Sequence, residues 1–83
     1  MDQQVEHEVI VYSTPTCPWC HVAKRYLTSR GIAYTEVDVA ADPAAAMEMV
    51  RKTGQQGVPV IEIDGECVIG FDRAQIDALL GLD

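Results

Sequence analysis

The chain has 83 residues, which allows one small domain with a single core and leaves no room for a second. Its composition of 48% hydrophobic and 23% charged residues is that of a folded chain and excludes disorder as the default state. Thirteen acidic against six basic residues give a formal net charge of -7, which would repel a polyanion, so we expect one domain over residues 1–83 and no nucleic-acid partner.

The start of the chain predicts no export. Residues 1–7 form a polar leader that lacks the basic start and apolar stretch of a secretory signal. No apolar run approaches the roughly 20 residues that would span a bilayer. We therefore expect a cytoplasmic monomer with no membrane partner, in a reducing compartment where closely spaced cysteines are more often catalytic or metal-binding than structural.

The first half of the chain predicts a strand, a helix and a second strand. Residues 8–13 form a β-branched and aromatic run, which indicates a buried strand. Apolar residues recur at helical spacing from Trp19 to Leu27, and Gly31 is a plausible end of that helix. Residues 32–39 alternate loosely between apolar and polar, which predicts another strand and completes a βαβ unit.

The second half predicts a helix, a hairpin and a last helix. Asp42 resembles an N-cap for a short helix with Pro43 at its first position, strong helix formers from Ala44 to Lys52, basic residues at its end and Gly54 beyond. The runs 58–63 and 66–69 flank an Asp-Gly pair, a strong hairpin signal. Asp72 resembles the first residue of a capping box. The order βαβαββα predicts an α/β fold, a mixed four-stranded sheet with helices on both faces.

Two cysteines two residues apart follow the first strand. If the helix begins at Pro18, Cys17 becomes its N-cap, and the free backbone amides and helix dipole favour the thiolate that attacks disulfides. Cys20 lies roughly one helical turn further on and deeper inside. We therefore expect Cys17 to be the catalytic nucleophile and Cys20 to displace the reduced product from a mixed disulfide.

The same motif permits other chemistry. Cys-x-x-Cys-His is also the attachment signature of c-type haem, with His21 as proximal ligand and Met47 or Met49 as distal ligand. Four predicted strands, the proline within the motif and the absence of an export signal argue against haem. A zinc site is weaker, because His7, His21 and Cys67 show no ligand spacing. We expect no bound metal and no tightly bound cofactor.

Three segments together resemble the glutaredoxin family: residues 12–20, Val58-Pro59 before the hairpin, and residues 70–72 before the last helix. The resemblance covers nearly the whole chain, from about Val9 to Leu80. It implies the thioredoxin-like fold, dithiol oxidoreductase activity, a cytoplasmic location, and disulfide-containing proteins and glutathione as partners. It also implies that Pro59 follows a cis peptide bond and that the Val58 backbone pairs with the cysteine of glutathione or of a substrate peptide.

The departures from the family concern the reductant. Many glutathione-dependent members carry lysine where Thr14 stands and a basic residue near Gln56, and both charges are missing here. Asp72 could still contact the glutathione ammonium. The segment around Phe71 is also similar to the redoxins that are recharged by thioredoxin reductase and donate electrons to ribonucleotide reductase. A further alternative is a module that holds an iron–sulfur cluster with Cys17 and glutathione.

The candidate substrate- or glutathione-binding residues gather from these segments: Thr14, Pro18, Trp19, Gln56, Val58, Pro59, Gly70, Phe71 and Asp72. Several other residues have plainer interpretations. The helical register of Trp19 is equally compatible with partial burial. We expect His21 and Lys24 to be solvated, the methionines at 47 and 49 to pack in the interior, and Cys67 to be a small strand residue opposite Glu62.

Overall fold

The computed structural model describes residues 7–82, so most of the polar leader predicted at residues 1–7 lies outside the described part. The elements follow the predicted order βαβαββα, which is confirmed. They are β1 (Val9–Ser13), α1 (Pro18–Ser29), β2 (Thr35–Asp38), α2 (Pro43–Thr53), β3 (Val60–Ile63), β4 (Glu66–Ile69) and α3 (Arg73–Leu80).

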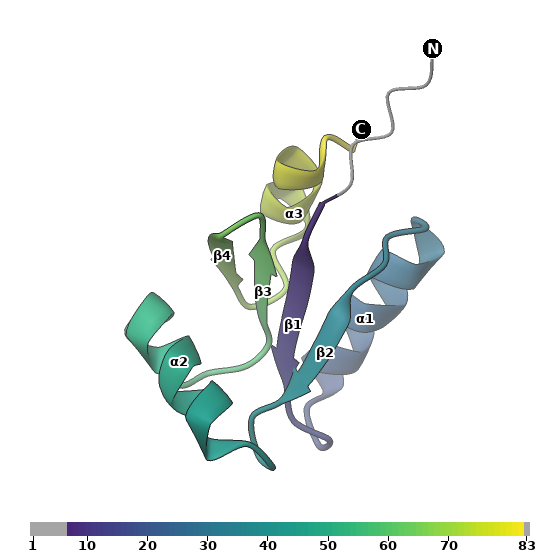
Figure 1. Ribbon diagram of the computed structural model, residues 1–83. Helices are drawn as coiled ribbons and strands as arrows, with labels where there is room; N and C mark the ends of the chain where they lie inside the picture. Colours follow the sequence, from purple (N-terminus) through teal and green to yellow (C-terminus); the bar gives the residue numbers. More distant parts are fainter. Residues whose placement is uncertain (1–6, 83) are drawn as a thin grey trace.

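The four strands form one mixed sheet in the order β2-β1-β3-β4. β1 runs parallel to β2 and antiparallel to β3, and β3 pairs with β4 in an antiparallel hairpin. Figure 1 shows α1 and α3 behind the sheet and α2 in front of it. The predicted mixed sheet with helices on both faces is therefore confirmed, and the end of β1 leads directly to the first turn of α1.

Each face of the sheet carries its own core. Behind the sheet, α1 and α3 bury one side of the strands in a cluster made of Val9, Val11, Ala23, Leu27, Ile61, Ile63, Val68, Ile76 and Leu80. In front, a smaller cluster joins α2 to the sheet through Met49, Tyr12 and Val60. Alternate residues along a strand point to opposite faces, which is how β1 supplies both clusters.

Local sequence signals place most element ends correctly. The Asp42 carboxylate accepts a hydrogen bond from the Ala45 N–H at 3.1 Å, and Asp72 caps α3 through the Gln75 N–H at 3.2 Å. The hairpin turn holds Asp64 and Gly65 at φ values of 51° and 90°. A two-residue hairpin turn whose twist matches that of the flanking strands requires positive φ at both of its central residues.

The second strand is shorter than predicted. The alternation over residues 32–39 indicated a strand along its whole length, but β2 spans only Thr35–Asp38. The Ile32 N–H donates to the Leu27 carbonyl oxygen at 2.9 Å. This N–H therefore closes the end of α1 and does not pair in the sheet. Gly31, at φ 72°, turns the chain at that point. Side chains of the connecting segment, Ile32 and Tyr34, still pack against the larger core.

The prediction that both methionines of α2 pack in the interior is half wrong. Met49 is 2% exposed, whereas Met47 is 74% exposed. The two lie two positions apart, about 200° around a helix, so they cannot share one face. Cys67 does lie opposite Glu62 in the hairpin, as predicted. No helix among residues 7–82 is long and apolar enough to cross a membrane.

Two isoleucines of the hairpin test the position of the core. Ile61 is 0% exposed and Ile69 is 53% exposed. Ile61→Ala should lower the free energy of unfolding by about 2–5 kcal/mol, because it leaves a cavity in the packed cluster, and Ile69→Ala by less than about 0.5 kcal/mol. Urea unfolding of the two variants measures both values. Equal losses would contradict the burial described here.

Candidate active site

Cys17 lies at the end of the segment that connects β1 to α1. It is the N-cap of α1, with φ -99° and ψ 108°, and Pro18 occupies the first helical position, as predicted. Its sulfur accepts a hydrogen bond from the Cys20 N–H at 3.1 Å. The sulfur thus satisfies one of the free amides of the first turn and lies at the positive end of the helix dipole, where negative charge is stabilised.

Cys20 has the opposite environment. It is 0% exposed and lies on the buried face of α1 with Ala23 and Leu27. Burial, and then the hydrogen bond with the Cys17 side chain, raise the pKa of Cys20 to about 11. The described structure holds both thiols free. The two sulfurs therefore differ in exposure, and burial disfavours the thiolate of Cys20.

A second segment, which lines a small groove, lies beside Cys17. The Val58–Pro59 peptide bond is cis, as the resemblance implied. The Val58 carbonyl oxygen lies 3.7 Å from the Cys17 sulfur, within reach of a thiol hydrogen bond. The groove has a volume of about 220 Å³ and is lined by Trp19, Val58, Pro59, Gly70 and Phe71. We name it the cysteine groove.

Trp19 lies at the surface. It is 61% exposed, so the partial burial that its helical register allowed is not observed. Its ring stacks on the ring of Phe71, with the two centroids 6.3 Å apart. Phe71 also packs against the larger core, which ties this aromatic pair to the sheet. The pair forms one wall of the cysteine groove.

The structure brings most of the predicted site residues together, but not all. The Thr14 carbonyl oxygen accepts the Cys17 N–H at 3.4 Å, so Thr14 adjoins the nucleophile through its backbone. Asp72 lies beside Phe71, with its carboxylate used as a helix cap. Gln56 is exposed and lines a different hollow, beside Met47 on α2. Gln56 is therefore not part of the wall of the cysteine groove.

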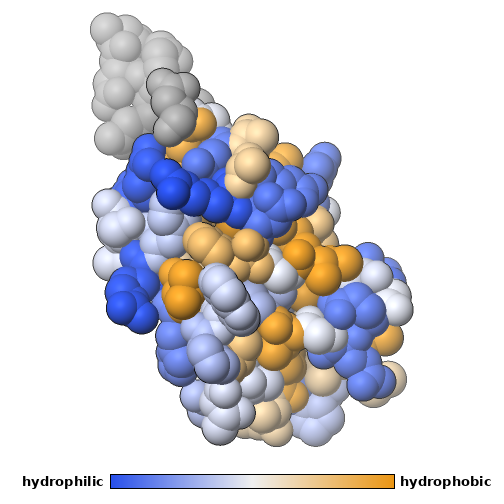
Figure 2. Space-filling view, turned by 180° about the vertical axis from the view of Figure 1, so that it is seen from behind, coloured by the Kyte–Doolittle hydropathy of each residue, from blue (hydrophilic) through white to orange (hydrophobic). Residues whose placement is uncertain are grey.

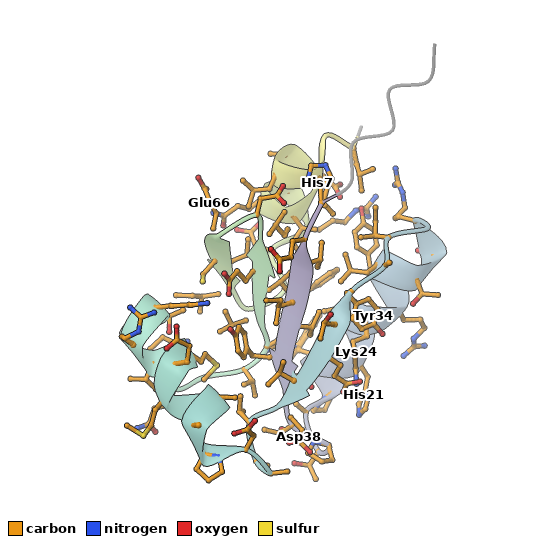
Figure 3. The ribbon with its side chains drawn as sticks, in the orientation of Figure 1. His7, His21, Lys24, Tyr34, Asp38 and Glu66 are labelled. Atoms are coloured by element: carbon orange, nitrogen blue, oxygen red, sulfur yellow. The ribbon has the colours of Figure 1, made fainter. Side chains whose placement is uncertain are left out.

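One cluster near Cys20 escaped sequence reasoning. The prediction that Lys24, one turn beyond Cys20, is solvated is wrong. Its side chain is only 16% exposed, and its Nζ lies 2.6 Å from Glu36 Oε2. The Ser13 hydroxyl donates to the same oxygen at 3.1 Å. Figure 3 shows Lys24 beside β2, the strand that carries Glu36. The four-residue spacing from Cys20 was visible in the sequence, but the position of Glu36 depends on the parallel register of β2.

This cluster sets local charges. The hydrogen bond to Glu36 raises the pKa of Lys24, and the same bond lowers the pKa of Glu36, so both stay charged near neutral pH. The positive charge of Lys24 lowers the pKa of Cys20 and partly opposes the effect of burial. Lys24 is thus a cation held near the less accessible thiol.

The remaining candidates take no part in the groove. His21 is exposed, as predicted, and its Nε2 lies 3.2 Å from the Pro15 carbonyl oxygen. On the other face of the sheet, Lys52 lies 2.8 Å from Glu62, and burial raises the pKa of the neighbouring Cys67. Within residues 7–82, no group of three or more His, Cys, Asp or Glu side chains is placed to hold a metal ion.

The sequence is similar to that of known proteins. The family model described as Glutaredoxin matches residues 9–68. The chain is 50% identical over 70 residues to an uncharacterized glutaredoxin-like 8.6 kDa protein in the rubredoxin operon of Clostridium pasteurianum, covering 84% of this chain and 93% of that protein. It is 38% identical over 76 residues to glutaredoxin 3 of Escherichia coli, covering 90% and 92%.

A solved structure with a similar fold is the glutaredoxin-like protein NrdH-redoxin from Escherichia coli, described by its thioredoxin-like activity profile. It superposes with a TM-score of 0.76 at 28% identity, over 87% of this chain and 93% of that one. The predicted thioredoxin-like fold is thereby confirmed. The capped first helix and the cis proline lie within residues 9–68, which the family model matches.

The raised pKa of Cys20 predicts a steep pH dependence of its reactivity. With a pKa of about 11, roughly one Cys20 in ten thousand is ionised at about pH 7. In a Cys17→Ser, Cys67→Ser variant, where burial still applies, alkylation of Cys20 by iodoacetamide should accelerate by nearly tenfold for each pH unit up to about pH 10. Mass spectrometry of timed samples gives the rates. A plateau below about pH 9 would show that Cys20 ionises like an exposed thiol.

Proposed function

This chain belongs to the glutaredoxin family of thiol–disulfide oxidoreductases, and we propose that it reduces disulfides by a dithiol route through Cys17 and Cys20. The observation that carries the proposal is the contrast between the thiols. Cys17 caps α1 beside an open groove, whereas Cys20 is 0% exposed one turn behind it. An attacking thiol needs access and a stabilised thiolate, while a resolving thiol needs only to reach its neighbour.

In the first step the Cys17 thiolate attacks one sulfur of the substrate disulfide. A new bond forms between that sulfur and the Cys17 sulfur, the substrate disulfide breaks, and the other substrate sulfur leaves as a thiolate that takes a proton from water. The helix amides that stabilise the thiolate are already in position, as the bond from the Cys20 N–H shows. This arrangement needs no rearrangement of α1 before attack.

In the second step Cys20 loses its proton and attacks the Cys17 sulfur. The mixed disulfide breaks, the substrate leaves reduced, and a Cys17–Cys20 disulfide remains. The Lys24 charge favours the Cys20 thiolate against the effect of burial. Two electrons from a reductant then restore the dithiol. Lys24 is in this account a positioning and electrostatic residue, because it contacts Glu36, which also accepts the Ser13 hydroxyl, rather than the reacting sulfurs.

The substrate backbone has a docking edge beside Cys17. Pro59 has no N–H, and β3 begins only at Val60, so the backbone of Val58 lies outside the sheet ladder. Its carbonyl oxygen lies 3.7 Å from the Cys17 sulfur. A cysteine of glutathione or of a substrate protein could pair there as a short added strand, with its neighbours against Trp19, Gly70 and Phe71.

Cysteine variants test the dithiol route. Cys17→Ser should lower reduction of any disulfide to the uncatalysed rate, because serine cannot form the mixed disulfide. Cys20→Ser should accumulate a mixed disulfide between Cys17 and a protein substrate, visible by mass spectrometry, because the resolving thiol is gone. Cys67→Ser is the matched control, since Cys67 lies in β4 opposite Glu62 and packs with the smaller cluster under α2, and it should keep full activity. Retained activity in Cys17→Ser would overturn the proposal.

A second candidate concerns the reductant. Glutathione is the co-substrate that the family resemblance implies, with Asp72 at the edge of the groove as a partner for its ammonium. However, Thr14 and Gln56 carry no positive charge for its carboxylates, and Gln56 lies outside the groove. The similarity to a redoxin with a thioredoxin-like activity profile supports the alternative that thioredoxin reductase recharges this protein in the cytoplasm. Ribonucleotide reductase is then a candidate acceptor.

One assay separates the two reductants. NADPH consumption is followed with the protein and an uncharged small disulfide, coupled either through glutathione and glutathione reductase or through thioredoxin reductase. The missing charges at Thr14 and Gln56 predict a higher turnover through thioredoxin reductase. Thr14→Lys should then raise the rate with glutathione by about two- to fivefold, because one exposed ion pair contributes about 0.5–1 kcal/mol. A faster glutathione route in the unchanged protein would contradict the second candidate.

A further inference from the structure

Three arginines gather around one tyrosine on the outer side of α1. The guanidinium carbons of Arg30 and Arg73 lie 6.0 and 5.3 Å from the centre of the Tyr26 ring. Arg25 and Arg73 line a groove of about 440 Å³ between α1 and the start of α3. We name it the arginine groove, and its lining residues are Val22, Arg25, Tyr26, Ser29, Phe71 and Arg73.

This gathering is unusual for so acidic a chain. The chain has only six basic residues against thirteen acidic ones. The other three basic side chains lie elsewhere, each in an ion pair: Lys24 with Glu36, Arg51 with Glu48 and Lys52 with Glu62. The arginine groove is therefore a positively charged patch on a molecule whose net charge is negative.

Acidic groups near the arginine groove only partly offset this charge. Asp77 accepts the Tyr26 hydroxyl hydrogen bond and lies 3.7 Å from Arg73 Nε. Asp72 is exposed and caps α3. Within residues 7–82, no carboxylate lies at ion-pair distance from Arg25, and its side chain is exposed. At least one guanidinium in the groove is thus available to a carboxylate from another molecule.

The arginine groove adjoins the site of chemistry. Phe71 lines both it and the cysteine groove, and its ring contacts Trp19 on one side and Tyr26 on the other. The centroids of Phe71 and Tyr26 are 5.7 Å apart. Figure 2, seen from the side of α1 and α3, shows hydrophobic side chains at the surface among strongly hydrophilic ones. A chain leaving the cysteine groove past Phe71 would meet apolar contacts and then arginines.

We propose that the arginine groove binds the segment that flanks the disulfide of a protein substrate, and that it selects segments combining apolar residues with Asp or Glu. This rests on the dithiol route proposed above and names the class of substrate for it. The apolar part packs on Tyr26 and Phe71, and the carboxylates pair with Arg25 and Arg73. An acidic segment would be repelled by most of this molecule, so the groove also fixes the direction in which the substrate lies.

Single-turnover kinetics test the substrate class without a reductant. The pre-reduced protein is mixed with peptides whose two cysteines form an internal disulfide followed by either Leu-Asp-Glu-Leu or Leu-Asn-Gln-Leu. Two electrons pass from the Cys17–Cys20 dithiol to the peptide disulfide, and the fluorescence of Trp19, the chain's one tryptophan, reports the step. The unchanged protein should reduce the acidic peptide about tenfold faster at low salt, and the ratio should fall towards one as salt is added.

Arginine variants locate the effect. Arg25→Gln combined with Arg73→Gln should bring the ratio between the acidic and neutral peptides to about one, whereas Arg51→Gln, which removes one positive charge from the outside of α2, should leave it near ten. Circular dichroism checks that the variants fold. A ratio of one in the unchanged protein, or a ratio that survives in the double variant, would overturn this proposal. Failure to reduce either peptide would instead overturn the dithiol route.

Discussion

The hydrogen bond from the Cys20 N–H to the Cys17 sulfur is the interaction on which the proposed chemistry depends. It exists because β1 ends one turn before a helix whose first residue is Pro18, so the cysteine between them becomes the cap. The same bond places the two sulfurs one helical turn apart. Local backbone geometry therefore prepares one thiol for attack and keeps the other within reach.

The sheet gives these two thiols different surroundings. The face of α1 that packs on the larger core carries Cys20 inward with Leu27, and burial raises the pKa of Cys20. The cap position leaves Cys17 half-buried, with its sulfur 3.7 Å from the Val58 carbonyl oxygen. Lys24, held by Glu36 of β2, carries a positive charge that partly opposes the effect of burial on the pKa of Cys20. The larger core thus stabilises the fold and also makes Cys20 the less accessible of the two thiols.

What the sequence could predict depended on how local each signal was. Capping by Cys17, Asp42 and Asp72 involves residues at most three positions apart, and each was predicted from the sequence. The pairing of Lys24 with Glu36 depends on how β1 and β2 align, which no local pattern encodes. The exposure of Trp19 and Met47 was equally undetermined, because helical spacing gives a face but not what covers it. Gln56, a candidate glutathione-binding residue, lines a hollow with residues of α2, a neighbourhood that no local pattern encodes.

The most direct test compares all three cysteines within one molecule. The reduced protein is treated near pH 7 with less than one equivalent of iodoacetamide, and the modified peptides are identified by mass spectrometry. Cys17 should carry nearly all of the label, because its sulfur is stabilised by the helix and accessible, while burial keeps both Cys20 and Cys67 protonated. Labelling of Cys20 or Cys67 ahead of Cys17 would contradict the assignment of the nucleophile.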